Sequence, residues 1–396
     1  MKFQSATEKA FGAVFLFLPI SKPLFFISFL VAVLLFIASG GFVKAVRSWR
    51  TLPWAAPAFI LAILPLLSLV IHRHIGQQVD SLDLSYYWLF ALITFLAASQ
   101  MSILPWMRML LCGIFLVFCY TLLAANGWWP FNRAPSAWAN SILYSQFLAV
   151  GIVLISILFK HEDRRHAKII YFVGMALFLI GLASGIGRTG MLIVAVLLPF
   201  ILGNLFPGRN LIKLVLACMV AIAVLLMSPT VQNRIEAAGN DIELFQGGVT
   251  QTSIGYRFEM WKTAWEVFRG NPVLGASPAG YVAAWTERQT AEAAKAMVEP
   301  HNAFMFFASS YGVIGLGALI WLYAALLWTG WVYRYRLEGA IVFAFAVTCI
   351  VASLTNTLFM GAVSHAWVML FIGLQGSLAQ PSTNAAPELR TKIAPT

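Results

Sequence analysis

Apolar runs separated by short polar breaks extend along most of the chain, and one long polar segment, Pro229–Pro300, interrupts them. A run of about 20 apolar residues can cross the hydrocarbon core of a bilayer as a helix, and about twelve such runs are present. The first is short and ends at Pro19. The centres of the runs are Phe15, Val31, Leu61, Leu92, Phe115, Ala149, Phe178, Val196, Met219, Leu319, Ala346 and Met369. The pattern predicts an all-α polytopic membrane protein.

The polar segment divides this predicted fold into regions. Residues 1–228 hold the first nine spans, residues 229–300 form a loop with amphipathic helices, and residues 301–380 hold the last three spans. Residues 381–396, with their Pro, Ser, Thr and Ala, have too few large apolar side chains to form a packed structure. We expect this tail to be disordered.

The distribution of lysine and arginine predicts the orientation, because these residues stay on the cytoplasmic side when they lie in short loops. With the amino terminus inside, the cytoplasmic residues outnumber the outer ones by about four to one. The cytoplasmic set is Lys2, Lys9, Lys44, Arg47, Arg50, Arg108, Lys160, Arg164, Arg165, Lys168, Arg209, Lys213, Arg334, Arg336, Arg390 and Lys392. The short outer loops hold Lys22, Arg73, Arg133 and Arg188. Both termini are therefore expected in the cytoplasm, and Pro229–Pro300 outside it.

Composition agrees with a membrane protein and excludes other classes. Hydrophobic residues make up 60% of the chain and charged residues 10%, outside the range of soluble domains. The net charge of +11 is mainly a signal of topology, with attraction to anionic membrane lipid as a second effect, so a nucleic-acid partner is not expected. All four cysteines fall within predicted spans, and no histidine has zinc-type spacing to cysteines or carboxylates.

A glycine-rich stretch, Gly185–Gly190, separates the seventh and eighth predicted spans. It matches G-x-G-x-x-G, but no strand precedes it and no acidic residue follows at the ribose-binding distance, so a dinucleotide site is excluded. The stretch predicts a turn at the outer face that exposes backbone N–H groups and carries Arg188. A guanidinium on such a turn suits a phosphate or diphosphate. The alternative is an interfacial turn whose arginine extends to lipid headgroups.

Within the polar segment, residues from Ile254 to Arg269 repeat apolar and aromatic side chains at helical spacing. Gly270, Asn271 and Pro272 end this predicted helix. The helix is expected to lie on or against the membrane, with Arg257 on the shoulder of its apolar stripe. Arg257 is then either a ligand for an anionic group or a solvated residue of an anchor helix.

A second predicted helix extends from about Tyr281 to Val298 and ends at Glu299-Pro300-His301-Asn302, where the tenth span begins. A histidine at the first turn of a helix feels the positive end of the helix dipole, which favours the neutral ring. A neutral imidazole can accept a proton from a hydroxyl, and Asn302 or Glu299 could orient the ring or the acceptor. The alternative is an interfacial histidine with no catalytic role.

These residues resemble the O-antigen ligase and polymerase superfamily, specifically the lipopolysaccharide O-antigen ligases. The resemblance extends over nearly the whole chain in layout. It is sharpest in Ser184–Gly190, in Arg257–Trp261 followed by Asn271–Gly275, and in Pro300–Ala303 followed by Tyr311–Gly315. Many relatives have serine directly before the first arginine, whereas this chain has Gly187 and lacks that hydroxyl.

The resemblance implies a membrane glycosyltransferase with a C-type-like helical fold. It would move O-antigen polysaccharide from undecaprenyl diphosphate to lipid A-core on the periplasmic face of the bacterial inner membrane. The diphosphate already activates the donor, so no cofactor is expected. Paired arginines can stabilise the leaving diphosphate without a metal, and no Asp-x-Asp motif is present.

The resemblance also implies roles for individual residues. Arg188 and Arg257 would bind the diphosphate, and His301 would deprotonate the acceptor hydroxyl, which would then attack opposite the leaving group and invert the anomeric centre. The further substrate-binding residues expected beside them are Trp261, Asn302 and Glu299.

Other functions stay open on the sequence. An O-antigen polymerase, or an enzyme that transfers glycan to protein serine or threonine, would use the same three residues. A small-anion transporter could also place arginines around a site. The scarcity of carboxylates within the spans, the location of all candidate groups at one face and the lack of two matching halves count against the transporter.

Overall fold

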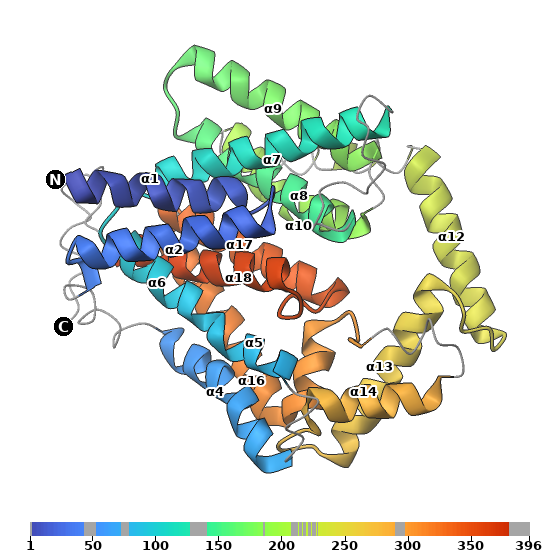
Figure 1. Cartoon of the computed structure of the whole chain (residues 1–396). Coiled ribbons are helices and arrows are strands. Elements are labelled where there is room, and N and C mark those ends of the chain that lie inside the picture. The colour runs from blue at the N-terminus through green and yellow to red at the C-terminus, as the bar shows by residue number, and fades with distance from the viewer. Residues whose placement is uncertain are drawn as a thin grey trace.

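The computed structural model describes residues 2–42, 53–72, 79–126, 141–184, 187–206, 229–289 and 298–379, with a few positions between 207 and 228. Every regular element in these ranges is a helix (Figure 1). Before the polar segment lie α1 (Lys2–Phe17), α2 (Lys22–Ala38), α4 (Ala55–His72), α5 (Val79–Tyr86), α6 (Trp88–Ala98), α7 (Leu104–Ala125), α8 (Ser141–Lys160), α9 (Arg165–Ser184) and α10 (Arg188–Leu205). The remaining helices are α12 (Pro229–Gln246), α13 (Ser253–Gly270), α14 (Ser277–Arg288), α16 (Ala303–Val332), α17 (Leu337–Thr355), α18 (Ala362–Gly373) and the 3₁₀ helix η2 (Leu374–Ala379).

The all-helical membrane fold predicted from the apolar runs is confirmed. Within the described ranges, 8 helices are long and apolar enough to cross a membrane, and two shorter apolar helices, Lys22–Ala38 and Leu82–Ala98, accompany them. The total of twelve stays a prediction. The first predicted span is the short helix α1, and the ninth is centred in the sparsely described stretch 207–228. The predicted tail 381–396 lies outside the described residues, and the division of the chain into regions stays a prediction.

One end of the bundle carries the amino terminus and several of the basic residues assigned to the cytoplasm. The indole N–H of Trp106 at the start of α7 donates to the carbonyl of Glu8 in α1, at 3.1 Å. Arg108 of α7 pairs with Glu162 in the turn between α8 and α9, 3.6 Å away. Arg108 and the turn between α8 and α9, both assigned to the cytoplasmic side from the sequence, therefore lie at the same end. The side of the membrane on which this end lies stays a prediction.

Helices α12, α13 and α14 lie at the other end of the bundle from the amino terminus (Figure 1). The predicted helix over 254–269 is confirmed by α13. The predicted helix from Tyr281 to Val298 is wrong in extent, since α14 begins at Ser277 and ends at Arg288. A proline in its first turn favours the earlier start, and Gln289 leaves the helical conformation at the end. Residues 290–297 lie outside the described ranges.

A break in α16 joins the polar segment to the bundle. Gly312 interrupts the helix with φ 64° and ψ −156°, and the freed N–H of Val313 donates to the carbonyl of Pro272 at 2.8 Å. On the other side of the break, the N–H of Ala276 donates to the carbonyl of Ser309 at 2.9 Å. A Cβ on Gly312 would lie 2.3 Å from the carbonyl oxygen of Val273, so only glycine fits. The turn after α13 is therefore held in the break by its backbone.

Candidate active site

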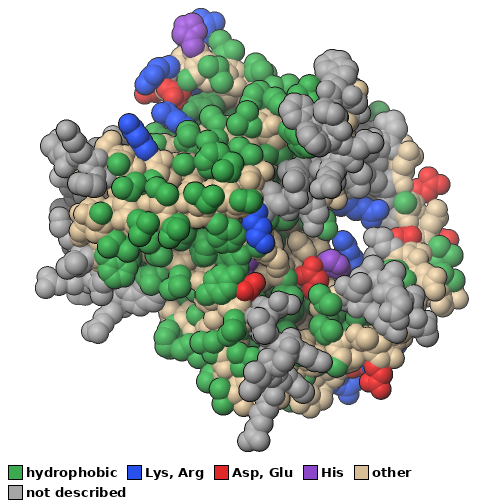
Figure 2. All heavy atoms as spheres, viewed as in Figure 1, with side chains coloured by type: hydrophobic (Ala, Val, Ile, Leu, Met, Phe, Trp, Pro, Cys, Tyr) green, Lys and Arg blue, Asp and Glu red, His purple; other side chains and the backbone are tan. Residues whose placement is uncertain are grey.

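Charged side chains gather at the end of the bundle where α12 and α13 lie. Figure 2 shows basic, acidic and histidine side chains around a hollow between these helices and the bundle, while most of the described surface around the bundle is hydrophobic. The predicted site residues come from separate elements that meet here: Arg188 from α10, Arg257 from α13, and His301 from the loop before α16.

Arg188 is the first residue of α10, so residues 188–190 of the predicted glycine-rich turn are helical, and residues 185–186 lie outside the described structure. Residues 188–190 are helical because α10 packs closely on α8. A Cβ on Gly190 would lie 2.1 Å from the carbonyl oxygen of Ser145, and the N–H of Gly190 donates to the Ser145 hydroxyl at 3.2 Å. Gly187 caps the helix without a side-chain bond, and Arg188 is exposed. The exposed guanidinium and the positive end of α10 both favour an anion at this position.

Helix α13 presents Arg257 toward Arg188. The hydroxyl of Thr252 caps α13 by accepting from the N–H of Gly255 at 3.0 Å. Met260 and Ala264 of α13 pack against Tyr281 and Trp285 of α14, and this small apolar cluster fixes the rotation of α13 about its axis.

The two guanidiniums act on each other. Burial lowers the pKa of Arg257, and the charge of Arg188 lowers it further. Among the described residues, neither arginine has a carboxylate partner within ion-pair distance. Two like charges without a counter-charge form a site that an anion with two or more negative charges would neutralise.

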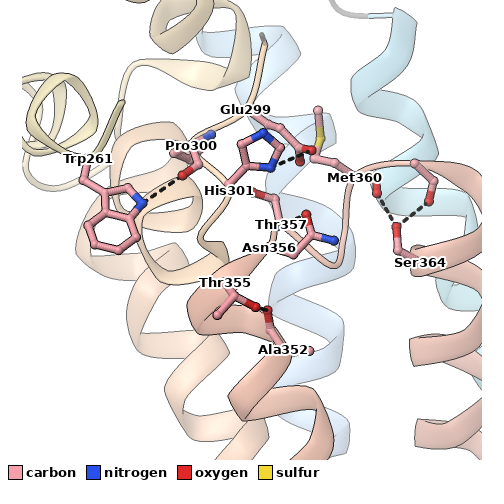
Figure 3. A network of polar contacts seen from close by, with 11 residues as sticks. Trp261, Glu299, Pro300, His301, Ala352, Thr355, Asn356, Thr357, Met360 and Ser364 are labelled. Atoms are coloured by element: carbon pink, nitrogen blue, oxygen red, sulfur yellow. Dashed lines mark hydrogen bonds and ion pairs between the residues drawn. The ribbon is translucent and has the colours of Figure 1, made fainter. Parts of the chain in front are cut away.

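The loop that carries His301 is held on both sides (Figure 3). The indole N–H of Trp261 donates to the carbonyl of Pro300 at 2.9 Å. Asn302 caps α16, since its Oδ1 accepts from the N–H of Met305 at 3.1 Å while its Nδ2 donates to the carbonyl of Leu354 at 3.2 Å. The polar groups of Trp261 and Asn302 thus position His301, and direct contact of either with substrate stays a prediction.

The His301 ring is neutral near pH 7. Burial lowers the pKa of His301, the charge of Arg257 lowers it further, and the side chain of Asn356 opposes both by raising it. The helix dipole of the tenth span, expected from the sequence to keep the ring neutral, is not the cause. His301 lies one residue before the cap Asn302, so burial and Arg257 are the causes, and they act in the direction that the sequence predicts.

Glu299 lies against the histidine ring, with its Oε1 3.5 Å from Nδ1 of His301. Burial raises the pKa of Glu299 to about 7, and the hydroxyl of Thr357 lowers it in part. The pKa of Tyr281 is raised by burial and then by the charge of Glu299, so the phenol of α14 also faces this carboxyl group. Glu299 therefore titrates near neutrality beside a ring that stays neutral.

Asn356 and Thr357, in the loop between α17 and α18, were not predicted as site residues. Oδ1 of Asn356 accepts from the N–H of Thr357 at 3.0 Å, and both side chains act on the Glu299–His301 pair. The hydroxyl of Thr355, one residue earlier, lies 2.9 Å from that of Thr189 in α10. The only sequence signal was a polar triplet, Thr355-Asn356-Thr357, set in an apolar run.

The described residues include no group of three or more His, Cys, Asp or Glu side chains that could hold a metal ion. The arrangement that they do form consists of two facing cations, a neutral imidazole and a carboxyl group that titrates near pH 7. It can bind a doubly charged anion and accept a proton beside it. Whether the reaction proceeds without a metal stays a prediction.

Residues 170–320 match the family model for O-antigen ligase, and this stretch includes Arg188, Arg257 and His301. No curated protein matches the chain. The match begins within α9 and ends within α16, so it includes α10, the helix α13 and the break in α16. The match supports membership of the chain in the O-antigen ligase/polymerase superfamily.

Proposed function

We propose that this protein transfers O-antigen polysaccharide from undecaprenyl diphosphate to lipid A-core on the periplasmic face of the bacterial inner membrane. The observation that carries the proposal is the electrostatic contact of Arg188 with Arg257 and of Arg257 with His301. These residues are far apart in the sequence and come from three elements that belong to the matched family region.

The arginine pair suits the leaving group of such a donor. When the glycosidic bond to the diphosphate breaks, its electron pair stays on the diphosphate, and negative charge grows there. Guanidiniums that are fixed before the reaction stabilise this charge more strongly than water does, because they need not reorient. Arg188 adds the positive end of α10, whose first backbone N–H groups point out of the helix.

His301 suits the proton transfer. The hydroxyl of the acceptor sugar gives its proton to the neutral ring while its oxygen forms the bond to the anomeric carbon. Attack from the face opposite the diphosphate inverts that centre. No nucleotide and no metal takes part in this scheme, since the diphosphate is the activating group and the arginines balance its charge.

Polymerisation of O-antigen units and transfer to protein serine or threonine would use the same groups and differ in the acceptor. The test is therefore a reconstitution of the purified protein with lipid-linked donor in three arms: donor alone, donor with lipid A-core, and donor with a serine-containing peptide. We expect glycan on lipid A-core only. Longer lipid-linked glycans from donor alone would identify a polymerase, and glycosylated peptide a protein transferase. Absence of product in all three arms would overturn the proposal.

The arginine pair supplies the control for each arm. Arg257→Ala should abolish transfer while leaving the protein folded, since Arg257 makes no ion pair in the described structure whose loss would destabilise it. Arg269→Ala, on the same helix, exposed and at the end away from His301, should transfer at the rate of the unsubstituted protein.

A further inference from the structure

Glu299 and His301 form a pair that the fold holds together against backbone strain. Their side chains are 23% and 28% exposed, and Nδ1 of His301 lies 3.5 Å from Oε1 of Glu299 (Figure 3). His301 has φ 48°, a left-handed conformation that is strained for a residue with a Cβ. The bond from Trp261 to Pro300 and the cap by Asn302 maintain this conformation. Strain retained in this way is typical of functional sites.

The groups around the pair come from four elements. Arg257 of α13 faces the ring, with Arg188 of α10 beyond it. Tyr281 of α14 faces the carboxyl group, as does Thr357 from the loop between α17 and α18. Within the described structure, Glu299 is the one acidic group in contact with the ring.

This environment creates a difficulty for a histidine base. When the ring accepts a proton from a hydroxyl it becomes a cation, and it does so beside Arg257 in a largely buried position. Both burial and a neighbouring positive charge disfavour that cation. A carboxylate at the opposite edge of the ring would offset both effects by stabilising the cation, as an acidic partner does for the histidine base in hydrolytic triads.

We propose that Glu299 is a positioning residue for His301: its carboxylate accepts the Nδ1–H, leaves Nε2 free to take the proton of the acceptor hydroxyl, and balances the charge of the imidazolium that forms. This inference rests on the function proposed above. The proton taken by Nε2 is later released to water or to the departed diphosphate, and Glu299 itself keeps no proton. The separation of 3.5 Å is long for a hydrogen bond, and such bonds shorten when substrate closes the site.

Under this proposal, Glu299 and His301 titrate as a coupled pair. As the pH falls, Glu299 takes up a proton near 7, because burial raises its pKa to about that value. The ring loses its acceptor at that point, and it is protonated itself only below 6.5. The ring of His301 should therefore respond to pH in two steps. Both steps describe the coupled titration of Glu299 and His301 and not of either residue alone.

Nitrogen-15 NMR of the protein with labelled histidine tests this without any substrate. The chain has 6 histidines, and the signals of His301 are those absent from His301→Gln. We expect these signals to move in two steps in the unsubstituted protein and in Glu299→Asp, but only in the step below 6.5 in Glu299→Gln. Glu287→Gln, which changes an exposed carboxylate of α14, should keep both steps. A single, identical step in all four proteins would overturn the proposal.

The transfer rate gives the second measurement. In Glu299→Gln, single-turnover transfer at pH 8 should fall about tenfold to a hundredfold because the imidazolium loses its counter-charge, while the KM for donor stays unchanged. The acid limb of the rate should also move from near 7 to below 6.5, a shift that a loss of structure alone would not produce. A fall in rate with an unmoved limb, or an unchanged rate, would overturn the role of Glu299. If the unsubstituted protein transfers to none of the three acceptors, the proposed function fails, and the NMR titration still decides whether the pair exists.

Discussion

Trp261→Phe tests whether the His301 loop is held in place by a single hydrogen bond. The substitution keeps an aromatic ring, although a smaller one, against the apolar surface and removes the indole N–H that donates to Pro300. A hydrogen bond of this kind contributes about 0.5–1.5 kcal/mol net, and the strained backbone of His301 adds a tendency to relax once it is lost. With 1.4 kcal/mol for each factor of ten, the fraction of protein with His301 in place should fall about twofold to tenfold.

The assay is single-turnover transfer at saturating donor, with the KM for donor measured beside it. We expect the rate to fall by that factor and the KM to stay constant, since Trp261 acts on the base and not on the diphosphate. Trp265→Phe is the matched control, because Trp265 lies one turn further along α13 and its side chain is 50% exposed. An equal loss in both variants would refute the idea that Trp261 holds the His301 loop. A rise in KM confined to Trp261→Phe would also refute it and would support direct contact of Trp261 with substrate.

Four further predictions follow from the same geometry. Arg188→Lys and Arg257→Lys should each lose most of the transfer rate, because lysine keeps the charge without the planar fork. The double substitution should raise the activation free energy of transfer by less than the sum of the two single substitutions. Gly312→Ala should lower both the thermal unfolding temperature in detergent and the transfer rate, since its Cβ would clash with Val273. Gly317→Ala, which has open space around it, should change neither quantity. Transfer should decline as the pH falls below neutrality, because Glu299 takes up a proton near pH 7 and, at lower pH, His301 is protonated and no longer acts as a base. Transfer should not respond to EDTA, since the arginines balance the charge of the diphosphate in the proposed reaction; loss of transfer on chelation would show that a metal takes part. In a variant without native cysteines, Lys262→Cys should react with an impermeant thiol reagent in the periplasm and Lys160→Cys only after lysis; the opposite result would reverse the orientation.

The parts of the fold that could be predicted are those fixed by local signals. Helix α13 extends over Ser253–Gly270, within a residue or two of the predicted range, because a clear apolar repeat precedes Gly270, Asn271 and Pro272. The catalytic candidates were found in the same way, since an arginine or a histidine in an apolar sequence is conspicuous wherever the chain folds.

The parts that could not be predicted depend on contacts between distant segments. The apolar pattern of α16 continues through Gly312, and the helix breaks there because the turn over Asn271–Gly275 supplies hydrogen bonds to the freed backbone. Asn356 and Thr357 form part of the site only because the loop after α17 folds against Glu299 and His301. Neither contact has a local sequence signal beyond a glycine or a short polar triplet.

The contacts that join the helices explain why two arginines stay close together with no carboxylate partner among the described residues. Helix α13, which carries Arg257, is tied to α16 by backbone bonds at the Gly312 break. The start of α10, which carries Arg188, is tied to the end of α17 through Thr189 and Thr355. Because these joints hold the guanidiniums in place, their repulsion is not relieved by movement, and the pKa of Arg257, which burial lowers, is lowered further by the charge of Arg188. A diphosphate between them would remove that repulsion, and it would do so most completely as the leaving group gains charge in the transition state. In the proposed reaction, the repulsion between the arginines would thus favour the transition state over the bound donor, which is the condition for a faster reaction.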